Sequence, residues 1–161
     1  MSRVVMLAEL HPSAVAIETS DGMKITYQGL MKRAFGVSQK LREAGAVPGT
    51  IVGIMLEPCI DMIAAMVGIC LARCAYMALD LDFATERLHH MVLDTATTIV
   101  VTSAELEARV SELGDSTMTA IVLSDRLPAH NSWLYDDVSQ ENPFYVIYTS
   151  VRPPCRGECS C

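Results

Sequence analysis

The sequence lacks an excess of positive charge. Its 161 residues include 12 basic and 19 acidic side chains, for a net charge of −7, and the basic residues are scattered singly or in pairs. Proteins that bind nucleic acid usually gather lysine and arginine on one patch or stripe. The composition therefore argues against nucleic acid as a partner.

A long apolar run is also missing. The most apolar stretch, Cys59 to Ala72, has about fourteen residues and contains Asp61, whereas a membrane span needs roughly twenty apolar residues. The five-residue apolar run before Glu9 is shorter than the core of a secretory signal, usually about 7–15 residues. We therefore expect a cytoplasmic protein without membrane contact, in which Cys59 to Ala72 forms a buried helix.

Hydrolase signatures are missing too. Neither Ser103 nor Ser150 has a nearby base, and the sequence contains no Gly-x-Ser-x-Gly motif. His89 and His90 are adjacent on an expected helix, so they point about 100° apart and are poorly placed to share a ligand. We expect both histidines to be solvated or half-buried.

The cysteines do not predict a metal site. Three of them cluster at the C-terminus without a local histidine, and the other three lie in or beside the apolar helix (Cys155, Cys159 and Cys161; Cys59, Cys70 and Cys74). A structural zinc site generally has four ligands. We expect the first group to belong to an unstructured tail whose thiols could oxidise or cross-link chains, and the second group to act as small apolar side chains.

What the sequence does contain is alternating apolar runs and amphipathic stretches, with 51% apolar residues. The runs expected as strands are 14–19, 24–27, 51–56, 75–79, 97–102, 119–123 and 144–149. We expect the last of these, from Phe144 to Tyr148, to be a buried strand. The expected helices are 27–44, 58–72, 84–95 and 103–114, the last with Ser103 as its N-cap. The polar, turn-rich residues 124–143 are expected to form a surface loop.

The most regular helix pattern covers residues 27–44. Apolar residues recur there at three- and four-residue steps (Leu30, Ala34, Val37 and Leu41). Thr26 is a suitable N-cap and Gly45 a suitable C-terminal stop. Gly29 stands where a glutamate would complete a capping box.

These patterns predict the fold class. A strand with no polar face, an apolar helix and a second buried strand are typical of a parallel βαβ unit. We expect a doubly wound α/β domain with a mostly parallel sheet flanked by helices, preceded by an N-terminal hairpin around Asp21 and Gly22.

Such sheets bind ligands beyond the carboxyl ends of their strands. Asp80 and Asp82 follow a strand and so could serve such a site, or they could cap the next helix. Five methionines at core spacing are expected to be packing residues (Met55, Met62, Met66, Met77 and Met91).

The sequences of four segments, in this order, resemble the start of an adenylation domain. Such domains belong to the adenylate-forming enzymes, and the resemblance is to the branch that activates amino acids. The segment ITYQGL is similar to L-T-Y-x-E-L, and the segment VPGTIVGIMLEPCIDMIAAMVGICLA is similar to G-D-x-V-x-I-x-L-E-R-S-x-E-M-I-x-A-x-L-G-I-L-K-A. The segment CAYMALDLDFATERLHHMVLDT is similar to G-A-Y-V-P-L-D-P-x-x-P-x-x-R-L-x-x-M-L-x-D, with Asp94 at its end. Leu71 and Arg73 replace the usual Lys and first Gly, and four residues replace one Gly and three Pro (Cys74, Ala78, Leu81 and Ala84).

The fourth segment is the family's phosphate-loop signature, Y-T-S-G-S-T-G-x-P-K-G. Tyr148, Thr149 and Ser150 match its first three positions, and VRPPCRGECSC then replaces the rest. Glycines let backbone N–H groups turn toward phosphate, whereas Pro153 and Pro154 have no N–H to donate. The resemblance thus implies Thr149 and Ser150 as the remaining cofactor-binding residues, with no catalytic residue in this chain.

The resemblance also implies an activity. The family uses ATP and Mg²⁺ to convert a carboxylate, here an amino acid, into an acyl-adenylate, and it passes the acyl group to a phosphopantetheine thiol. We expect residues 1–150 to be a partial adenylation domain that is inactive alone, and residues 151–161 to be an aberrant tail from a frameshift, an unspliced intron or a misjudged gene end. The alternatives are an interaction module that binds a partner or a second copy through its bare sheet edge, and a flavodoxin-like domain, which would need a Gly-rich phosphate turn.

Overall fold

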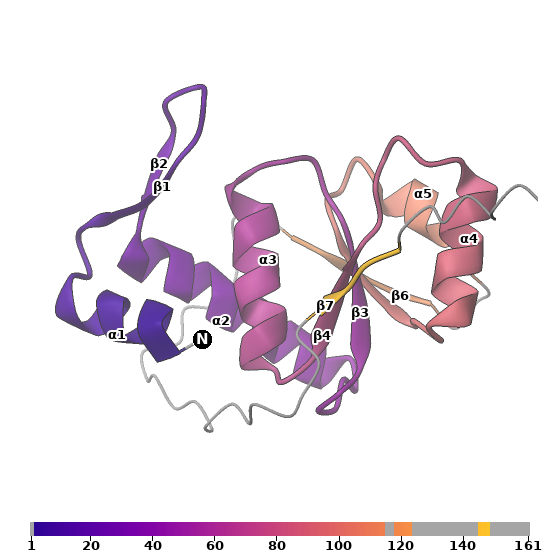
Figure 1. The fold of residues 1–161 in the computed structure, drawn as a ribbon, viewed down its shortest axis with the longest axis horizontal. Helices are drawn as coiled ribbons and strands as arrows, with labels where there is room; N and C mark the ends of the chain where they lie inside the picture. Colours follow the sequence, from indigo (N-terminus) through magenta and orange to yellow (C-terminus); the bar gives the residue numbers. More distant parts are fainter. Residues whose placement is uncertain (1, 115–117, 124–144, 149–161) are drawn as a thin grey trace, which may run out of the picture.

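The structure is a computed structural model that describes residues 2–114, 118–123 and 145–148. Its centre is a five-stranded parallel sheet with the strand order β6-β5-β3-β4-β7 (Figure 1). The strands are β3 (Ile51–Met55), β4 (Ala75–Ala78), β5 (Ile99–Thr102), β6 (Thr119–Val122) and β7 (Tyr145–Val146). The connecting helices are α3 (Ile60–Leu71), α4 (Thr85–Asp94) and α5 (Glu107–Ser111). The predicted α/β class and parallel sheet are confirmed.

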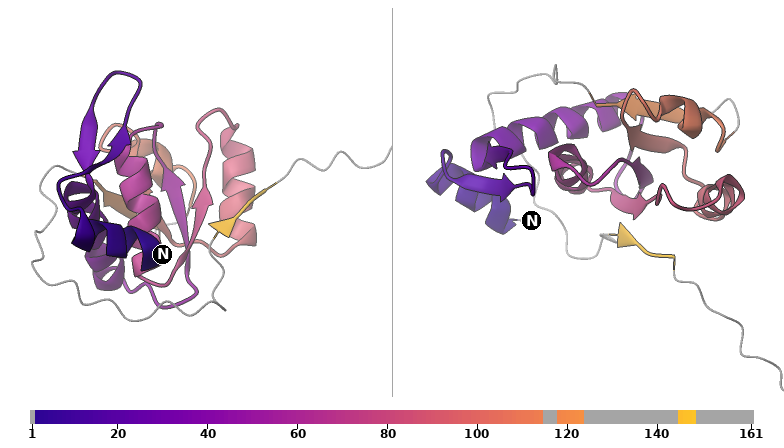
Figure 2. Two further views of the ribbon diagram at one scale, coloured as in Figure 1. Left: turned by 60° about the vertical axis from the view of Figure 1, so that its left-hand side comes forward. Right: turned by 90° about the horizontal axis from the view of Figure 1, so that it is seen from above.

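Helices cover both faces of this sheet, because the strands are apolar on both sides. The helix α2 (Tyr27–Glu43) packs with α3 over one face, and α4 and α5 lie over the other (Figure 2). Alternate residues of β5 show the division: Ile99 and Val101 belong to the α2–α3 core cluster, and Val100 belongs to the α4–α5 core cluster. Period-two alternation thus builds two cores around one strand.

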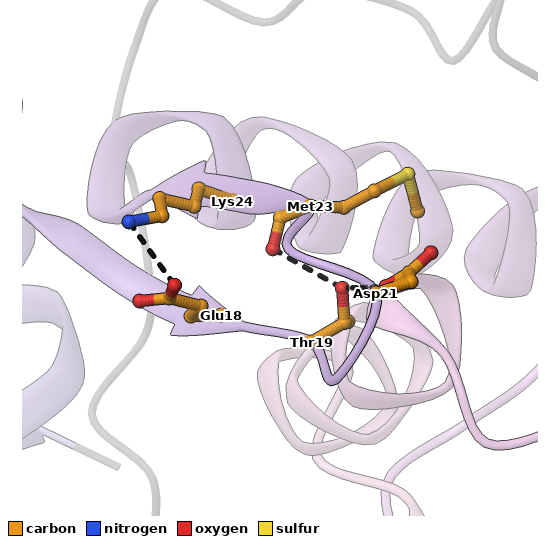
Figure 3. A network of polar contacts seen from close by, with 5 residues as sticks. All are labelled: Glu18, Thr19, Asp21, Met23 and Lys24. Carbon is orange, nitrogen blue, oxygen red and sulfur yellow. Dashed lines mark hydrogen bonds and ion pairs between the residues drawn. The ribbon is translucent and has the colours of Figure 1, made fainter.

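A hairpin and a short helix precede the sheet. The strands β1 (Val15–Glu18) and β2 (Lys24–Thr26) pair antiparallel, as predicted. Figure 3 shows the turn between them, where the hydroxyl of Thr19 lies within hydrogen-bond reach of the Asp21 carboxylate and the Met23 carbonyl. The hydrogen bond from Thr19 lowers the pKa of Asp21. An ion pair of 3.1 Å between Lys24 and Glu18 joins the two strands.

The predicted ends of α2 are confirmed. The Thr26 hydroxyl accepts a hydrogen bond of 3.1 Å from the Gly29 amide, and Gly45 follows the helix with a φ of 85°. The amides of Gly45 and Ala46 donate to the carbonyls of Arg42 and Leu41. This pair of bonds is a Schellman motif, in which the residue with positive φ is usually glycine.

The same motif ends α3 and α4, but without glycine. Arg73 and Ala96 hold the position of positive φ, at 61° and 49°. Cys74 donates to the Ile69 carbonyl across the end of α3, and Thr97 donates to the Val92 carbonyl across the end of α4. Two of these three helix ends therefore hold a residue other than glycine in a left-handed backbone conformation, which is unfavourable for residues with a side chain.

One element was not predicted, and two predictions about the elements are wrong. The sequence did not predict the helix α1 (Ser2–Leu10). The last helix begins at Glu107 rather than after Ser103, so Ser103 is not its N-cap. The strand β7 is not buried, because it lies at the edge of the sheet. Tyr145 of β7 and Ile147, which follows the strand, have 53% and 68% of their surface exposed. The loop expected at 124–143 lies outside the described residues.

No helix in the described part of the chain combines the length and the apolar character that a membrane crossing requires.

Candidate functional site

The segment expected to bind phosphate follows β7. Because β7 pairs in parallel with β4, its carboxyl end lies at the edge of the sheet where β3 and β5 also end. Ligands of α/β sheets bind beyond this edge. Thr149 and Ser150, the predicted cofactor-binding residues, lie outside the described residues. Tyr148 directly precedes them and is described.

Tyr148 is tied to the end of α4. Its hydroxyl donates a hydrogen bond to the Asp94 carboxylate, and its ring packs against the α4–α5 core cluster. The hydrogen bond to Asp94, followed by desolvation, raises the pKa of Tyr148 to about 12. The phenol therefore keeps its proton to a higher pH than an ordinary tyrosine, and it is the donor in this bond.

A cavity of about 410 Å³ lies at the same edge, between the carboxyl ends of β3 and β4 and the residues that lead into α3. Its apolar lining includes Ile54, Leu56, Met62, Met66 and Leu79. Three acidic side chains complete the lining: Glu57, Asp80 and Asp82, all of them exposed. Asp80 and Asp82 follow β4, as the sequence indicated, and this position places both side chains at the cavity.

The alternative role for these aspartates, capping of α4, is wrong. The N-cap position of α4 is Ala84, which makes no side-chain cap. Asp80 instead accepts a hydrogen bond of 3.0 Å from the Asp82 amide, within the turn that leaves β4. Both aspartates come too early in the chain to occupy the position whose side chain reaches the first-turn amides.

The acidic lining decides what this cavity can accept. In the described part of the chain, none of its three carboxylates takes part in an ion pair. Their negative charge disfavours a triphosphate, which is usually held by lysine, arginine or glycine-rich backbone amides. Within the described ranges, no cluster of three or more acidic, histidine or cysteine side chains could hold a metal ion. The described lining of this cavity therefore presents acidic groups rather than the groups that usually hold a triphosphate.

The remaining candidates behave as structural residues. His89 and His90 are both exposed, as expected, and His89 Nδ1 lies 2.8 Å from the Leu113 carbonyl oxygen. The five methionines expected in the core are buried or packed against it (Met55, Met62, Met66, Met77 and Met91). Cys70 and Cys74 are buried and Cys59 is partly buried, in agreement with their expected apolar role. The three cysteines near the C-terminus lie outside the described residues.

A family model for AMP-binding enzymes matches residues 6–150. The chain belongs to this family. The resemblance to adenylate-forming enzymes drawn from the four sequence segments is thereby confirmed, and the match ends at Ser150, the last residue that follows the phosphate-loop signature.

Curated relatives of this chain include peptide synthetases. The chain is 36% identical over 151 residues to the hybrid PKS-NRPS synthetase pyvA of Aspergillus violaceofuscus. The aligned region covers 92% of this chain and 4% of that protein. It is 35% identical over 141 residues to bacitracin synthase 1 of Bacillus licheniformis, covering 86% of the chain and 3% of that protein. The chain thus spans only a small part of the length of these relatives.

Solved structures of the family have the same fold. The nonribosomal peptide synthetase FmoA3, in a form bound to α-methyl-L-serine-AMP, superposes with a TM-score of 0.82 at 28% identity. The match covers 91% of this chain and 16% of FmoA3. The five-stranded parallel sheet is therefore arranged as in an adenylate-forming enzyme.

One contact in this structure has no signal in the sequence. Tyr148 and Asp94 match different family segments and are 54 residues apart. Each residue could be identified as part of a family segment, but no periodicity or spacing joins them. Only the parallel addition of β7 beside β4 brings the two together.

Proposed function

We propose that residues 1–150 are the N-terminal part of an adenylation domain in a protein that activates an amino acid. In the proposed reaction the amino acid carboxylate attacks the α-phosphate of ATP, which releases pyrophosphate and leaves an aminoacyl-adenylate. The acyl group then passes to the thiol of a phosphopantetheine carrier, and AMP is released. The observation that carries this proposal is the AMP-binding match over residues 6–150, together with relatives named as peptide synthetases.

The proposal includes a role for two residues. Thr149 and Ser150 continue the family segment that starts at Tyr148, and we assign them to the start of the phosphate-binding loop of the domain. Their hydroxyl and amide groups are suitable donors for phosphate oxygens. Residues 151–161 are proposed to lie outside the domain, because Pro153 and Pro154 stand where backbone amides are needed.

Residues 1–161 alone are proposed to be inactive. The described cavity at the carboxyl edge presents Glu57, Asp80 and Asp82 rather than groups that bind phosphate. The sequence after Ser150 offers two prolines in place of the family's glycines. Apart from the contribution proposed for Thr149 and Ser150, the groups that bind ATP, Mg²⁺ and the carrier thiol are proposed to come from the rest of the adenylation domain.

Pyrophosphate exchange is the test. The purified 161-residue chain is incubated with ATP, Mg²⁺, radiolabelled pyrophosphate and each of the standard amino acids, beside a complete adenylation domain such as that of bacitracin synthase 1. We expect exchange only from the complete domain. Exchange by the 161-residue chain above the no-enzyme background would contradict its proposed inactivity.

The family-level proposal is tested separately with a chimera. Residues 6–150 of this chain replace the equivalent part of the complete domain, so that the phosphate loop and the catalytic remainder come from the host. Amino-acid-dependent exchange by the chimera supports the assignment of residues 1–150. A chimera that is folded by circular dichroism but silent with every amino acid would count against it.

A further inference from the structure

The carboxylate of Asp94 touches the residue from which the candidate phosphate-binding segment starts. Asp94 is the last residue of α4, and its Oδ2 accepts the hydrogen bond of the Tyr148 hydroxyl. In Figure 1 the yellow strand β7 runs from its place beside β4 toward α4. The bond therefore connects the end of the sheet's edge strand to a helix that is fixed by its own core contacts.

The strand β7 is short, and apart from Tyr148 it is held by its pairing with β4, by the contact of the Tyr145 ring with the Tyr76 ring at 6.1 Å between centroids, and by Val146 on the α4–α5 core cluster. It consists of two residues, Tyr145 and Val146, which pair with Tyr76 and Met77 of β4. Its neighbour Ile147 has 68% of its surface exposed. Two ladder positions are a weak attachment, because a strand of ordinary length has about five or six residues. The Tyr148 side chain adds a ring packed on the α4–α5 core cluster and a hydroxyl bonded to a carboxylate.

Asp94 is itself well anchored. It belongs to the helix that buries Leu88, Met91 and Val92, and the Schellman motif directly after it fixes the helix end. A charged acceptor forms a stronger hydrogen bond than a neutral one. The geometry is thus that of a fixed acceptor and a tethered donor.

We propose that Asp94 is a positioning residue: by holding the Tyr148 hydroxyl, it fixes the end of the described segment 145–148, the point from which the proposed phosphate-binding segment starts. This inference rests on the proposed function, which gives that segment its role. In the chain as it stands, the same bond docks β7 against α4. Asp94 acts through Tyr148 and touches no substrate.

Phenol ionisation tests the bond in the 161-residue chain without any nucleotide. At pH 11, with the fold checked by circular dichroism, absorbance at 295 nm counts ionised tyrosines, and Tyr148 should remain protonated. Asp94→Ala removes the acceptor and should add one phenolate, whereas Asp94→Asn keeps an acceptor oxygen and should restore the bond in part. In a Tyr148→Phe background, Asp94→Ala should add none. The same added phenolate in both backgrounds would overturn the assignment.

Hydrogen exchange tests the positioning. At neutral pH, Asp94→Ala and Tyr148→Phe should each speed exchange of the amides at 145–148 by about tenfold, the factor expected for losing one charge-assisted bond. Exchange in α3 and the midpoint of urea unfolding should not change. Tyr148→Phe keeps the ring, so it should fold even if Asp94→Ala does not. Unchanged exchange at 145–148 in Tyr148→Phe would refute the proposal, whether or not the chimera described above is active.

Discussion

Arg73 occupies, at the end of α3, the position that Gly45 occupies at the end of α2. Both residues have positive φ, 61° for Arg73 and 85° for Gly45. In both motifs the following amide donates to the carbonyl five residues before it, from Cys74 to Ile69 and from Ala46 to Leu41. The two helix ends therefore have the same geometry, and only their residue types differ.

Replacing Arg73 by glycine should stabilise the fold. A side chain in the left-handed conformation costs roughly 1–2 kcal/mol, and glycine recovers part of this while adding chain entropy to the unfolded state. The buried Arg73 Nε, which has no hydrogen-bond partner among the described residues, is removed as well. For Arg73→Gly we expect the free energy of unfolding in urea to rise by about 1 kcal/mol. A decrease in the free energy of unfolding would mean that contacts of the arginine side chain stabilise the fold by more than its backbone strain destabilises it.

Gly45 supplies the matched control, with the opposite sign. Apart from its two chain neighbours, no described residue has an atom within 4 Å of the position of a Cβ at Gly45, so Gly45→Ala tests backbone conformation without a steric clash. We expect a loss of about 1 kcal/mol in the free energy of unfolding. If Gly45→Ala and Arg73→Gly shift the urea midpoint in the same direction, the left-handed position is not what controls these helix ends.

Gly68 allows α2 and α3 to approach closely. A Cβ at this position would lie 2.5 Å from the Ala34 carbonyl oxygen and 2.7 Å from the Val37 Cβ, both on α2. Helix propensity alone would make Gly68→Ala stabilising by about 1 kcal/mol, whereas overpacking costs about 1–3 kcal/mol. Because the nearest atom is a backbone oxygen that cannot rotate away, we expect net destabilisation. Thermal unfolding followed by circular dichroism decides the sign.

The sequence predicts the regular part of this fold because local patterns and tertiary packing agree there. Thr26, the apolar face of α2 and Gly45 each point to the same helix, and the structure confirms all three. The strands with apolar residues on both faces likewise required a sheet covered on both sides.

Where the sequence misleads, the deciding contacts are distant. The helix α1 has no acidic residue in its first turn, and its buried Val5 and Ala8 pack with Met31 and Ala34 of α2. The apolar segment at β7 suggests a buried strand, but Tyr145 lies at a sheet edge that only the topology reveals. The Tyr148–Asp94 bond depends on the same topology, so no local pattern could have predicted it.

The ion pair between Arg33 and Asp61 joins α2 and α3, and we expect it to contribute little to stability. The Arg33 Nη1 atom contacts the Asp61 carboxylate, but 37% and 38% of the two side chains' surfaces are exposed. Exposed pairs usually contribute about 0.2–1 kcal/mol. A double-mutant cycle with Arg33→Gln and Asp61→Asn should give a coupling free energy in this range that falls as salt is added. A salt-independent coupling above this range would show that the pair behaves as a buried one.

The thiol of Cys70 should resist alkylation in the folded chain. Burial is the main cause that raises the pKa of Cys70 to about 11, from an ordinary value of 9.0. Because the thiolate is the reactive form, Cys70 should react slowly with iodoacetamide at pH 8 and begin to react only as the pH approaches 11. Its raised folded-state pKa favours the folded state below pH 9, and this contribution is lost as the pH rises from 9 through 11.

Partly buried Cys59 is the internal control for the alkylation of Cys70. Peptide mapping after timed alkylation should show Cys59 modified first, and comparable rates for both thiols at pH 8 in folded protein would contradict the buried environment of Cys70.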